Sequence, residues 1–213
     1  MHIVFLFYEG MTALDAVGPH EILCRLPGTT VKRVARSSGE ISTDSGLILT
    51  AEYKLSDVLK ADVLFIPGAG SAASLREYPD VLEWIRNIHA TTTWTTSVCT
   101  GSLILGAAGL LSGIKATTHW AALDRLPAYG SVPVQSRIVE SGKIITAAGV
   151  SAGIDMALTL AEKISGRLVA EALQLGIEYD PEPPFNSGSP EKADPKLVET
   201  LRKKMVFKFE SQS

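Results

Sequence analysis

The sequence predicts an α/β fold in which a mostly parallel sheet is covered by helices on both faces. Two observations carry this prediction. Short apolar runs of strand length alternate along the chain with longer segments of helical periodicity, which is the pattern of strand–helix–strand units. The chain has 213 residues, of which 46% are hydrophobic and 20% are charged, so it is long enough to bury one sizeable core.

The first strand is expected at residues 3–8, where the apolar run is continuous, as in a strand buried on both faces. The run at 93–98 is rich in β-branched residues, which favour strands. Residues 135–140 and 143–147 flank a Ser-Gly pair and are expected to form a hairpin. Residues 41–50 indicate a small β excursion. The remaining strands are expected at residues 31–36 and 62–66.

Helical patterns fill the intervals between these runs. They are expected at residues 19–26, 79–90, 100–111, 119–126, 151–164 and 168–176. Because a helix between two strands returns the chain to the same end of the sheet, the strands are expected to be parallel. Ligands of such sheets bind outside the carboxyl ends of the strands. Side chains in the loops after the strands are therefore the candidates for a site.

We expect residues 1–180 to form one α/β domain. The composition changes in the tail, where residues 181–195 hold five of the eleven prolines and read as an extended connector. Residues 194–205 carry an apolar stripe at helical spacing. Residues 181–213 are thus expected to be a proline-rich connector and a C-terminal helix that packs on the same domain or on a partner subunit.

Composition argues against several classes of protein. A net charge of −3 does not provide the basic surface that nucleic acids need. No apolar run approaches the roughly eighteen residues of a membrane span. Two cysteines cannot form a disulfide framework, and the spacing of a metal motif is absent, so no metal is expected. The N-terminus lacks the basic leader and cleavage site of a signal peptide, so we expect a cytoplasmic location.

Cys99 is the strongest candidate for chemistry. It ends one apolar run and opens a helical pattern, with the small residues Ser97 and Gly101 two positions to either side. Small residues at these positions suit the tight strand-to-helix turn of a nucleophile elbow. The free N–H groups at the start of the following helix predict a lowered pKa for the thiol. The alternative is a buried structural cysteine, which is the role we expect for Cys24.

Asp15 is the second candidate, because it follows the first strand within an otherwise apolar stretch. Pro19 has no N–H to bond the Asp15 carbonyl, so we expect an irregular backbone at Asp15 and a helix that begins at Pro19. An isolated carboxylate in such a place is a candidate site residue. The spacing from Thr12 to Asp15 is equally that of a capping pair at a helix start. The sequence leaves both interpretations open.

Further candidates lie in the other loops after the strands. Gly68, Ala69 and Gly70 follow a strand without the lysine of a phosphate loop, so their backbone N–H groups are expected to face an oxyanion. His119 either pairs with the cysteine or is a polar helix-start or core histidine. Asp155 is a lone acid on a mostly apolar helix, where it either supports the site by hydrogen bonding or complements the helix dipole.

Five motifs in order along residues 1–178 resemble the ThiJ/PfpI superfamily, whose flavodoxin-like α/β sandwich is related to that of class I glutamine amidotransferases. They are Asp-Ala-Val-Gly-Pro at 15–19, Asp-Val-Leu-Phe-Ile-Pro-Gly at 62–68, Ser-Val-Cys-Thr-Gly-Ser at 97–102, Ala-Thr-Thr-His-Trp at 116–120 and Thr-Ala-Ala-Gly-Val-Ser-Ala-Gly-Ile-Asp at 146–155. The tail at 178–190 is similar to the ending of the isocyanide hydratase branch.

The resemblance implies roles for three residues. Cys99 matches the family's nucleophile, and Asp15 matches the acid that partners it. Thr100 stands where protease-like members carry a histidine, which argues against peptide hydrolysis. The implied activity is hydration of isocyanides to N-substituted formamides through a thioimidate. It implies a small-molecule electrophile as substrate, no cofactor and a homodimer. The alternatives are a glyoxalase- or deglycase-like enzyme acting on methylglyoxal, and a non-enzymatic redox or stress sensor in which Cys99 oxidises.

Overall fold

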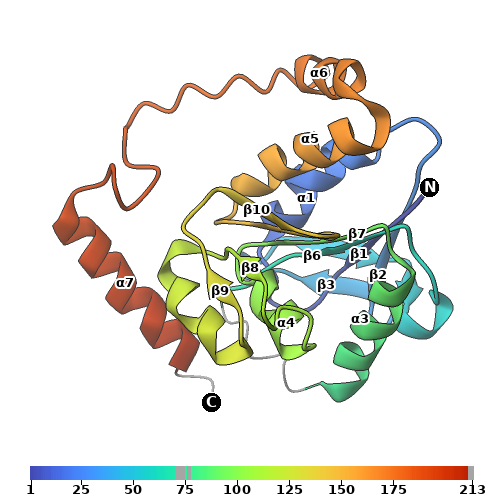
Figure 1. Cartoon of the computed structure of the whole chain (residues 1–213), viewed down its shortest axis with the longest axis horizontal. Coiled ribbons are helices and arrows are strands. Elements are labelled where there is room, and N and C mark those ends of the chain that lie inside the picture. The colour runs from blue at the N-terminus through green and yellow to red at the C-terminus, as the bar shows by residue number, and fades with distance from the viewer. Residues whose placement is uncertain (71–74, 76–77, 211–213) are drawn as a thin grey trace.

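The computed structural model describes residues 1–70, 75 and 78–210, with side chains described up to residue 205. Figure 1 shows a central sheet with helices on both of its faces. Within the described residues this sheet has seven strands. In spatial order they are β10 (Ile138–Ser141), β11 (Ile144–Ala147), β7 (Trp94–Val98), β6 (Val63–Ile66), β1 (His2–Leu6), β2 (Thr30–Ala35) and β5 (Tyr53–Lys54).

The strands of this sheet pair in parallel, except that β10 runs antiparallel to β11. One face is covered by α1 (Ala13–Leu23) and α5 (Ala152–Ser165), and α6 (Arg167–Gly176) packs on α5 (Figure 1). The other is covered by α3 (Pro79–Thr91), α4 (Gly101–Ala107) and the 3-10 helix η2 (Trp120–Tyr129). The expected α/β sandwich of the flavodoxin-like type is therefore confirmed.

The predicted strands fall on observed ones because their apolar runs are buried on both faces of the sheet. Every residue of β6 is fully buried, as are Ile3–Leu6 of β1. The excursion at 41–50 is a separate hairpin of β3 (Gly39–Ser42) and β4 (Ile48–Ala51). The remaining short elements were not predicted, since a two-residue strand has no periodicity. They are β5, β8 (Lys115–Ala116), β9 (Val132–Pro133) and the 3-10 turn η1 (Leu55–Asp57).

The first helix begins earlier than the sequence predicts. It starts at Ala13, so Asp15 lies in a regular first turn and Pro19 lies inside the helix. The expectation of an irregular backbone at Asp15 is wrong, because a proline here removes one helical hydrogen bond without ending the helix. The capping pair does not form either. The Thr12 hydroxyl instead donates to Asp44 Oδ2 at 2.6 Å.

Two other helices also differ from expectation. The helix predicted at 100–111 ends at Ala107, because Gly109 takes a left-handed φ of 79° and the Leu110 N–H turns back to the Leu105 carbonyl at 3.0 Å. The helix predicted at 119–126 is the 3-10 helix η2, which continues to Tyr129.

The carboxyl ends of the central strands meet at one edge of the sheet. In the register of β6 and β7, Ile66 pairs with Ser97, and in that of β7 and β11, Val98 pairs with Ala147. The loops after β1 and β6 are tied together, since Thr12 N donates to the Gly68 carbonyl at 2.9 Å. This edge therefore gathers the loops in which the sequence placed its candidates.

The C-terminal helix α7 (Pro195–Glu210) follows the connector and lies against η2 of the same chain (Figure 1). The Arg202 guanidinium lies 5.2 Å from the centre of the Trp120 ring. Met205 packs at the margin of the core. Residues 211–213 of the predicted tail lie outside the described residues. None of the helices that the structure describes combines the length and the apolar character needed to cross a bilayer.

Candidate functional site

Cys99 lies at the tight turn between β7 and α4. It has a φ of 55°, in the left-handed region that residues with a Cβ rarely adopt. Its N–H donates to the carbonyls of Ala147 and Ala148 at 3.1 and 2.8 Å, and its own carbonyl accepts from the Thr118 hydroxyl at 2.8 Å. Gly101 is required by packing, because a Cβ there would lie 2.4 Å from the Ile66 carbonyl oxygen. The predicted elbow geometry is confirmed.

Asp15 is held against this turn by a backbone group. Its Oδ2 accepts a hydrogen bond of 2.8 Å from Gly68 N, and its side chain is fully buried. Its Oδ1 is buried without a hydrogen bond from another described side chain or backbone group at standard distance. The carboxyl lies near enough to the Cys99 thiol for each group to affect the pKa of the other. The sequence candidates Cys99 and Asp15 are thus brought together.

Both Asp15 and Cys99 have raised pKa values. Burial raises the pKa of Asp15 from 3.8 to about 7, against the opposing effect of the Gly68 hydrogen bond. Burial also raises the pKa of the Cys99 thiol well above its usual value, and the adjacent Asp15 charge raises it further. Backbone N–H groups of Thr100 and Val150 favour the thiolate but do not compensate. The predicted low thiol pKa is therefore wrong, because burial and a neighbouring carboxylate outweigh the helix terminus.

The backbone N–H groups of the loop after β6 donate hydrogen bonds to side chains of the site. Gly68 N is engaged by Asp15, and Ala69 N donates to the Thr100 hydroxyl at 2.9 Å. Thr100 returns a hydrogen bond to the Ala69 carbonyl at 2.8 Å. The expectation that the N–H groups of Gly68 and Ala69 face an oxyanion is therefore wrong for this geometry, because both already have acceptors. Gly70 lies in the turn that follows, and its oxyanion role stays a prediction.

The Gly68 backbone lies close against the elbow. A Cβ at this position would lie 2.5 Å from Thr100 N and 2.9 Å from Cys99 Cβ. Glycine is needed here for close approach, since a side chain would separate the Gly68 N–H from Asp15. The candidates Thr100 and Gly68 therefore shape the site through packing and hydrogen bonds.

His119 begins η2. Its Nδ1 accepts from Ala121 N at 3.2 Å, so it caps the helix as one of the sequence interpretations expected. Its ring also packs closely on Gly149, where a Cβ would lie 2.8 Å from His119 Cδ2. Burial lowers the pKa of the imidazole and favours its neutral form. The histidine therefore acts in the structure as a helix cap that packs against the loop after β11.

Asp155 makes its described contacts away from the sulfur. It forms an ion pair with Arg137 and accepts from the Tyr179 hydroxyl at 2.8 Å. The ion pair is partly exposed, with 28% of the Asp155 side chain accessible to solvent. These contacts join α5 to the loop before β10 and to the start of the tail. The dipole alternative also fits, since Asp155 lies in the first turn of α5.

The sequence analysis missed Tyr8, Val150 and Thr118. The Tyr8 hydroxyl donates to the Pro67 carbonyl at 2.8 Å, and burial together with the charges of Asp15 and Cys99 raises the pKa of the phenol. A signal was available for two of them, because Tyr8 ends the first predicted strand and Val150 follows the predicted strand at 143–147. Thr118 follows β8, which was not predicted and lies outside the central sheet. Cys24 also differs from expectation: it is half-buried at the C-cap of α1 rather than in the core.

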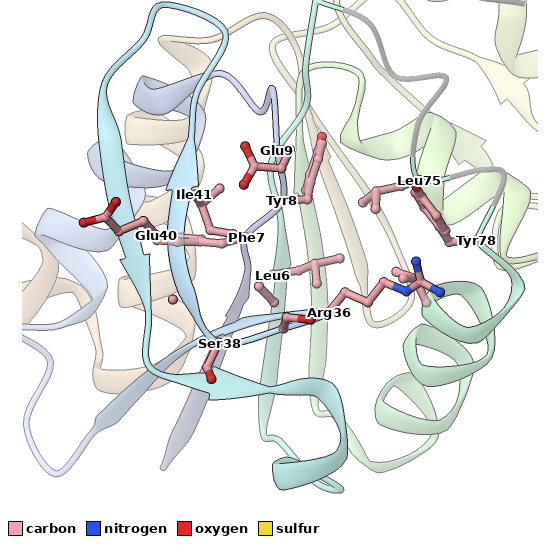
Figure 2. Close-up of a pocket in the computed structure, with 14 residues that line it drawn as sticks. Leu6, Phe7, Tyr8, Glu9, Arg36, Ser38, Glu40, Ile41, Leu75 and Tyr78 are labelled. Carbon is pink, nitrogen blue, oxygen red and sulfur yellow. The ribbon is translucent and has the colours of Figure 1, made fainter.

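A cavity of about 310 Å³ lies beside the site (Figure 2). It is bounded by the ends of β1 and β2, the start of β3, and α3. Tyr8 stands in its wall, whereas Cys99 and Asp15 are not among the residues that line it. Figure 2 shows Tyr8 between Glu9 and Leu75, with Arg36 and Tyr78 at the side of the cavity formed by α3. Among the described residues, no group of three or more His, Cys, Asp and Glu side chains could hold a metal ion.

The chain matches the DJ-1/PfpI family over residues 1–163. It is 42% identical over 204 residues to isonitrile hydratase from Pseudomonas putida, spanning 96% of this chain and 90% of that protein. A ThiJ/PfpI family protein from Pseudomonas syringae has a crystal structure that matches with a TM-score of 0.94 and 37% identity, over 96% of this chain and 86% of that one.

A more distant structure shares the fold. Drosophila melanogaster DJ-1beta matches with a TM-score of 0.75 at 19% identity, over 83% of this chain and 97% of that one. The family match covers the sheet, the elbow and most of the helices described above. The chain therefore belongs to the DJ-1/PfpI family.

Proposed function

We propose that this protein hydrates isocyanides, which are also called isonitriles, to N-substituted formamides. The observation that carries the proposal is the buried pair of Cys99 and Asp15 at the elbow. Burial raises the pKa of both groups, and the charge of Asp15 raises that of the thiol further. The 42% identity to an isonitrile hydratase over 96% of the chain supports this substrate class. In this proposal Cys99 is the nucleophile and Asp15 is the general acid and base.

The first step adds the thiol across the terminal carbon of the isocyanide. The Cys99 sulfur forms the bond to carbon as Asp15 takes the thiol proton, and Asp15 then gives that proton to the same carbon. The product is a thioimidate in which the carbon carries one hydrogen and a double bond to nitrogen. A carboxyl with a pKa of about 7 suits both directions of this transfer at neutral pH.

The second step is hydrolysis of the thioimidate. A water molecule adds to the carbon as Asp15 accepts one of its protons, and Asp15 then gives that proton to the nitrogen. The resulting tetrahedral adduct expels the sulfur, which regains its proton, and the N-substituted formamide leaves. Atoms balance as one isocyanide plus one water giving one formamide. The raised thiol pKa is compatible with this scheme, because the thiol is deprotonated only as it attacks.

The structure also supports a preference for an uncharged substrate. Lysine and arginine are absent from the described loop segments at 9–15, 67–70, 99–102 and 147–153, so these segments offer no cationic anchor for an anionic substrate. Gly68 packs closely against Thr100 and against the Cβ of Cys99, so there is little room on this side of the elbow. An isocyanide presents a narrow, linear and neutral reacting group, which needs neither space nor a counter-charge at the carbon that is attacked.

The test measures two products with one preparation of the protein. A simple alkyl or aryl isocyanide is expected to give its formamide, measured by NMR, with a kcat/KM at least about tenfold above that for lactate formation from methylglyoxal, or roughly 1.4 kcal/mol of transition-state preference. The Cys99→Ala variant is expected to give no formamide. Lactate without formamide would instead identify a glyoxalase. Neither product, with rapid formation of Cys99 sulfinate in dilute peroxide, would identify a redox sensor.

A further inference from the structure

A continuous chain of hydrogen bonds links Tyr8 to the reacting pair. The Tyr8 hydroxyl donates to the Pro67 carbonyl at 2.8 Å, and the Gly68 N–H donates to Asp15 Oδ2 at 2.8 Å. The Pro67 carbonyl and the Gly68 N–H belong to the same peptide group. This peptide group therefore accepts a hydrogen bond from Tyr8 at its oxygen and donates one to the Asp15 carboxylate from its N–H.

This arrangement has a physical consequence for Asp15. A hydrogen bond to a peptide oxygen polarises the group and strengthens the bond made by its N–H, by about 10–30% per bond in such chains. The hydrogen bond from Gly68 lowers the pKa of Asp15 because it favours the ionised carboxylate. A stronger bond from Gly68 would lower this pKa further. Tyr8, Pro67, Gly68 and Asp15 are all buried, which strengthens hydrogen bonds between them.

We propose that Tyr8 is a positioning residue for the Cys99–Asp15 pair, acting through the Pro67–Gly68 peptide. It fixes the orientation of that peptide and thereby of the Asp15 carboxyl to which the Gly68 N–H donates. Naming the pair as the reacting one rests on the proposed function, whereas the hydrogen-bond chain does not. The raised pKa of the phenol keeps Tyr8 protonated, and so a donor, throughout the pH range in which Asp15 titrates.

The Tyr8→Phe variant isolates the hydroxyl. The ring of Tyr8 forms part of the cavity wall in Figure 2, and phenylalanine keeps that ring while removing the donor. Tyr78→Phe is the matched control, because Tyr78 lines the same cavity but caps α3, where its ring lies against the Arg36 guanidinium at 4.4 Å. Both variants are made in a Cys24→Ser background, so that Cys99 is the single cysteine.

The readout is the rate of Cys99 alkylation by iodoacetamide, followed by intact mass between about pH 5 and 9. In the background protein the rate is expected to rise through an inflection near 7, where the pair loses its first proton. In Tyr8→Phe the inflection is expected to move upward by about 0.3–1 pH unit, since the carboxylate loses stabilisation. Tyr78→Phe is expected to leave it in place. An unmoved inflection in Tyr8→Phe, or equal shifts in both variants, would overturn the proposal.

A second pair of variants separates action through Asp15 from direct action on the sulfur. In Asp15→Asn the inflection near neutral pH is expected to vanish, and adding Tyr8→Phe is expected to change the profile no further. A profile that still shifts when Tyr8→Phe is added would show that the phenol acts on Cys99 itself. That result would overturn the proposed relay, the action of Tyr8 through the Pro67–Gly68 peptide and Asp15.

A measurement on the unmodified protein covers the case in which Tyr8→Phe does not fold. With tyrosine labelled at Cζ, the Tyr8 carbon resonance and the Gly68 amide resonance are expected to titrate together near 7, where Asp15 changes charge. A Tyr8 resonance that stays flat through this range would contradict the relay. Formamide turnover is recorded in parallel. Absent turnover with the expected alkylation shift would reject the proposed function alone, and normal turnover without the shift would reject the relay alone.

Discussion

Asp15 and Asp155 occupy equivalent places in two helices that pack against each other, yet their surroundings are opposite. Asp15 lies in the first turn of α1 and Asp155 in the first turn of α5. The first is fully buried and takes its hydrogen bond from a backbone N–H. The second is partly exposed and is matched by a guanidinium and a phenol.

The difference shows that position on a helix does not decide what a carboxylate can do. A first-turn acid is stabilised by the helix dipole in both places. Asp155 also meets Arg137, so its charge is compensated at the surface. Asp15 meets a thiol and a single N–H in a buried space, so its pKa rises to about 7 and its proton becomes available for transfer.

The largest contrast is expected in turnover. Asp15→Asn keeps the shape of the side chain and its acceptor for Gly68 but removes the titratable proton, so kcat/KM for formamide formation should fall by about 10²–10⁴-fold. Asp155→Asn should lower it far less. Steady-state kinetics of both variants check this, with circular dichroism to establish that each is folded. Equal losses in the two variants would contradict the distinction between the two aspartates.

The pH dependence of stability is the second contrast. The pKa of Asp15 rises from 3.8 to about 7 on folding, so between these values the folded protein holds a proton that the unfolded chain has lost. Raising the pH through this range therefore lowers the free energy of unfolding, by up to roughly 4 kcal/mol from this group alone. The decline should be missing from Asp15→Asn and present in Asp155→Asn.

Urea unfolding of the three proteins between about pH 4 and 7.5 measures this effect. The difference between the wild type and Asp15→Asn cancels the groups that titrate in both. The free energy of unfolding of Asp15→Asn should increase relative to that of the wild type as the pH rises. A constant difference across the range would show that Asp15 has an ordinary pKa in the folded protein.

A smaller effect is expected from filling the space beside the buried aspartate. In Gly68→Ala the new methyl would lie 2.5 Å from Thr100 N, so the loop must shift and unfolding should become easier by about 1–3 kcal/mol. The same shift moves the Gly68 N–H off Asp15 and should lower turnover. Gly176→Ala is the control, since its added methyl would meet no described atom within 4 Å beyond its chain neighbours and the nearby backbone of its own helix, and it should be neutral or stabilising. Denaturant midpoints compare the two.

The smallest effect is expected at the exposed aspartate. Tyr179→Phe removes the hydrogen bond of 2.8 Å to Asp155, and partly exposed bonds of this kind contribute about 0.5–1 kcal/mol. Arg137→Ala breaks an ion pair whose arginine is 49% exposed, and such pairs contribute about 0–1 kcal/mol. Thermal melts of both variants should therefore shift by a few degrees at most. A large drop in Tm would mean that this cluster anchors the helix more firmly than its exposure indicates.

The sequence was sufficient to predict the elbow and every strand of the central sheet except β5. Continuous apolar runs predict strands buried on both faces, and the small residues on either side of Cys99 predict a tight turn from strand to helix. The start of α1 was misplaced because the local rule for Pro19 gave no weight to packing, whereas α1 is held against α5 close to Gly153. Local backbone rules therefore failed where tertiary contact decided the outcome.

The acidity of the pair and the use of the loop N–H groups could not be predicted from the sequence. The thiol pKa depends on how deeply Cys99 is buried and on the distance of Asp15, and both are set by the fold. The Ala69 N–H is taken by the Thr100 hydroxyl, which lies 31 positions further along the chain. Tyr8 gave only its position at the end of a strand as a signal, because its role depends on an acceptor in the loop after β6.

The left-handed backbone at Cys99 has a consequence for laboratory evolution. A residue with a Cβ is destabilised by about 1–2 kcal/mol in this conformation, whereas glycine adopts it freely. Selection for thermostability alone is therefore expected to enrich Cys99→Gly and to discard the sulfur. Any library screened for heat resistance must also be screened for turnover, because under the proposed mechanism a more stable variant with glycine at this position would be inactive.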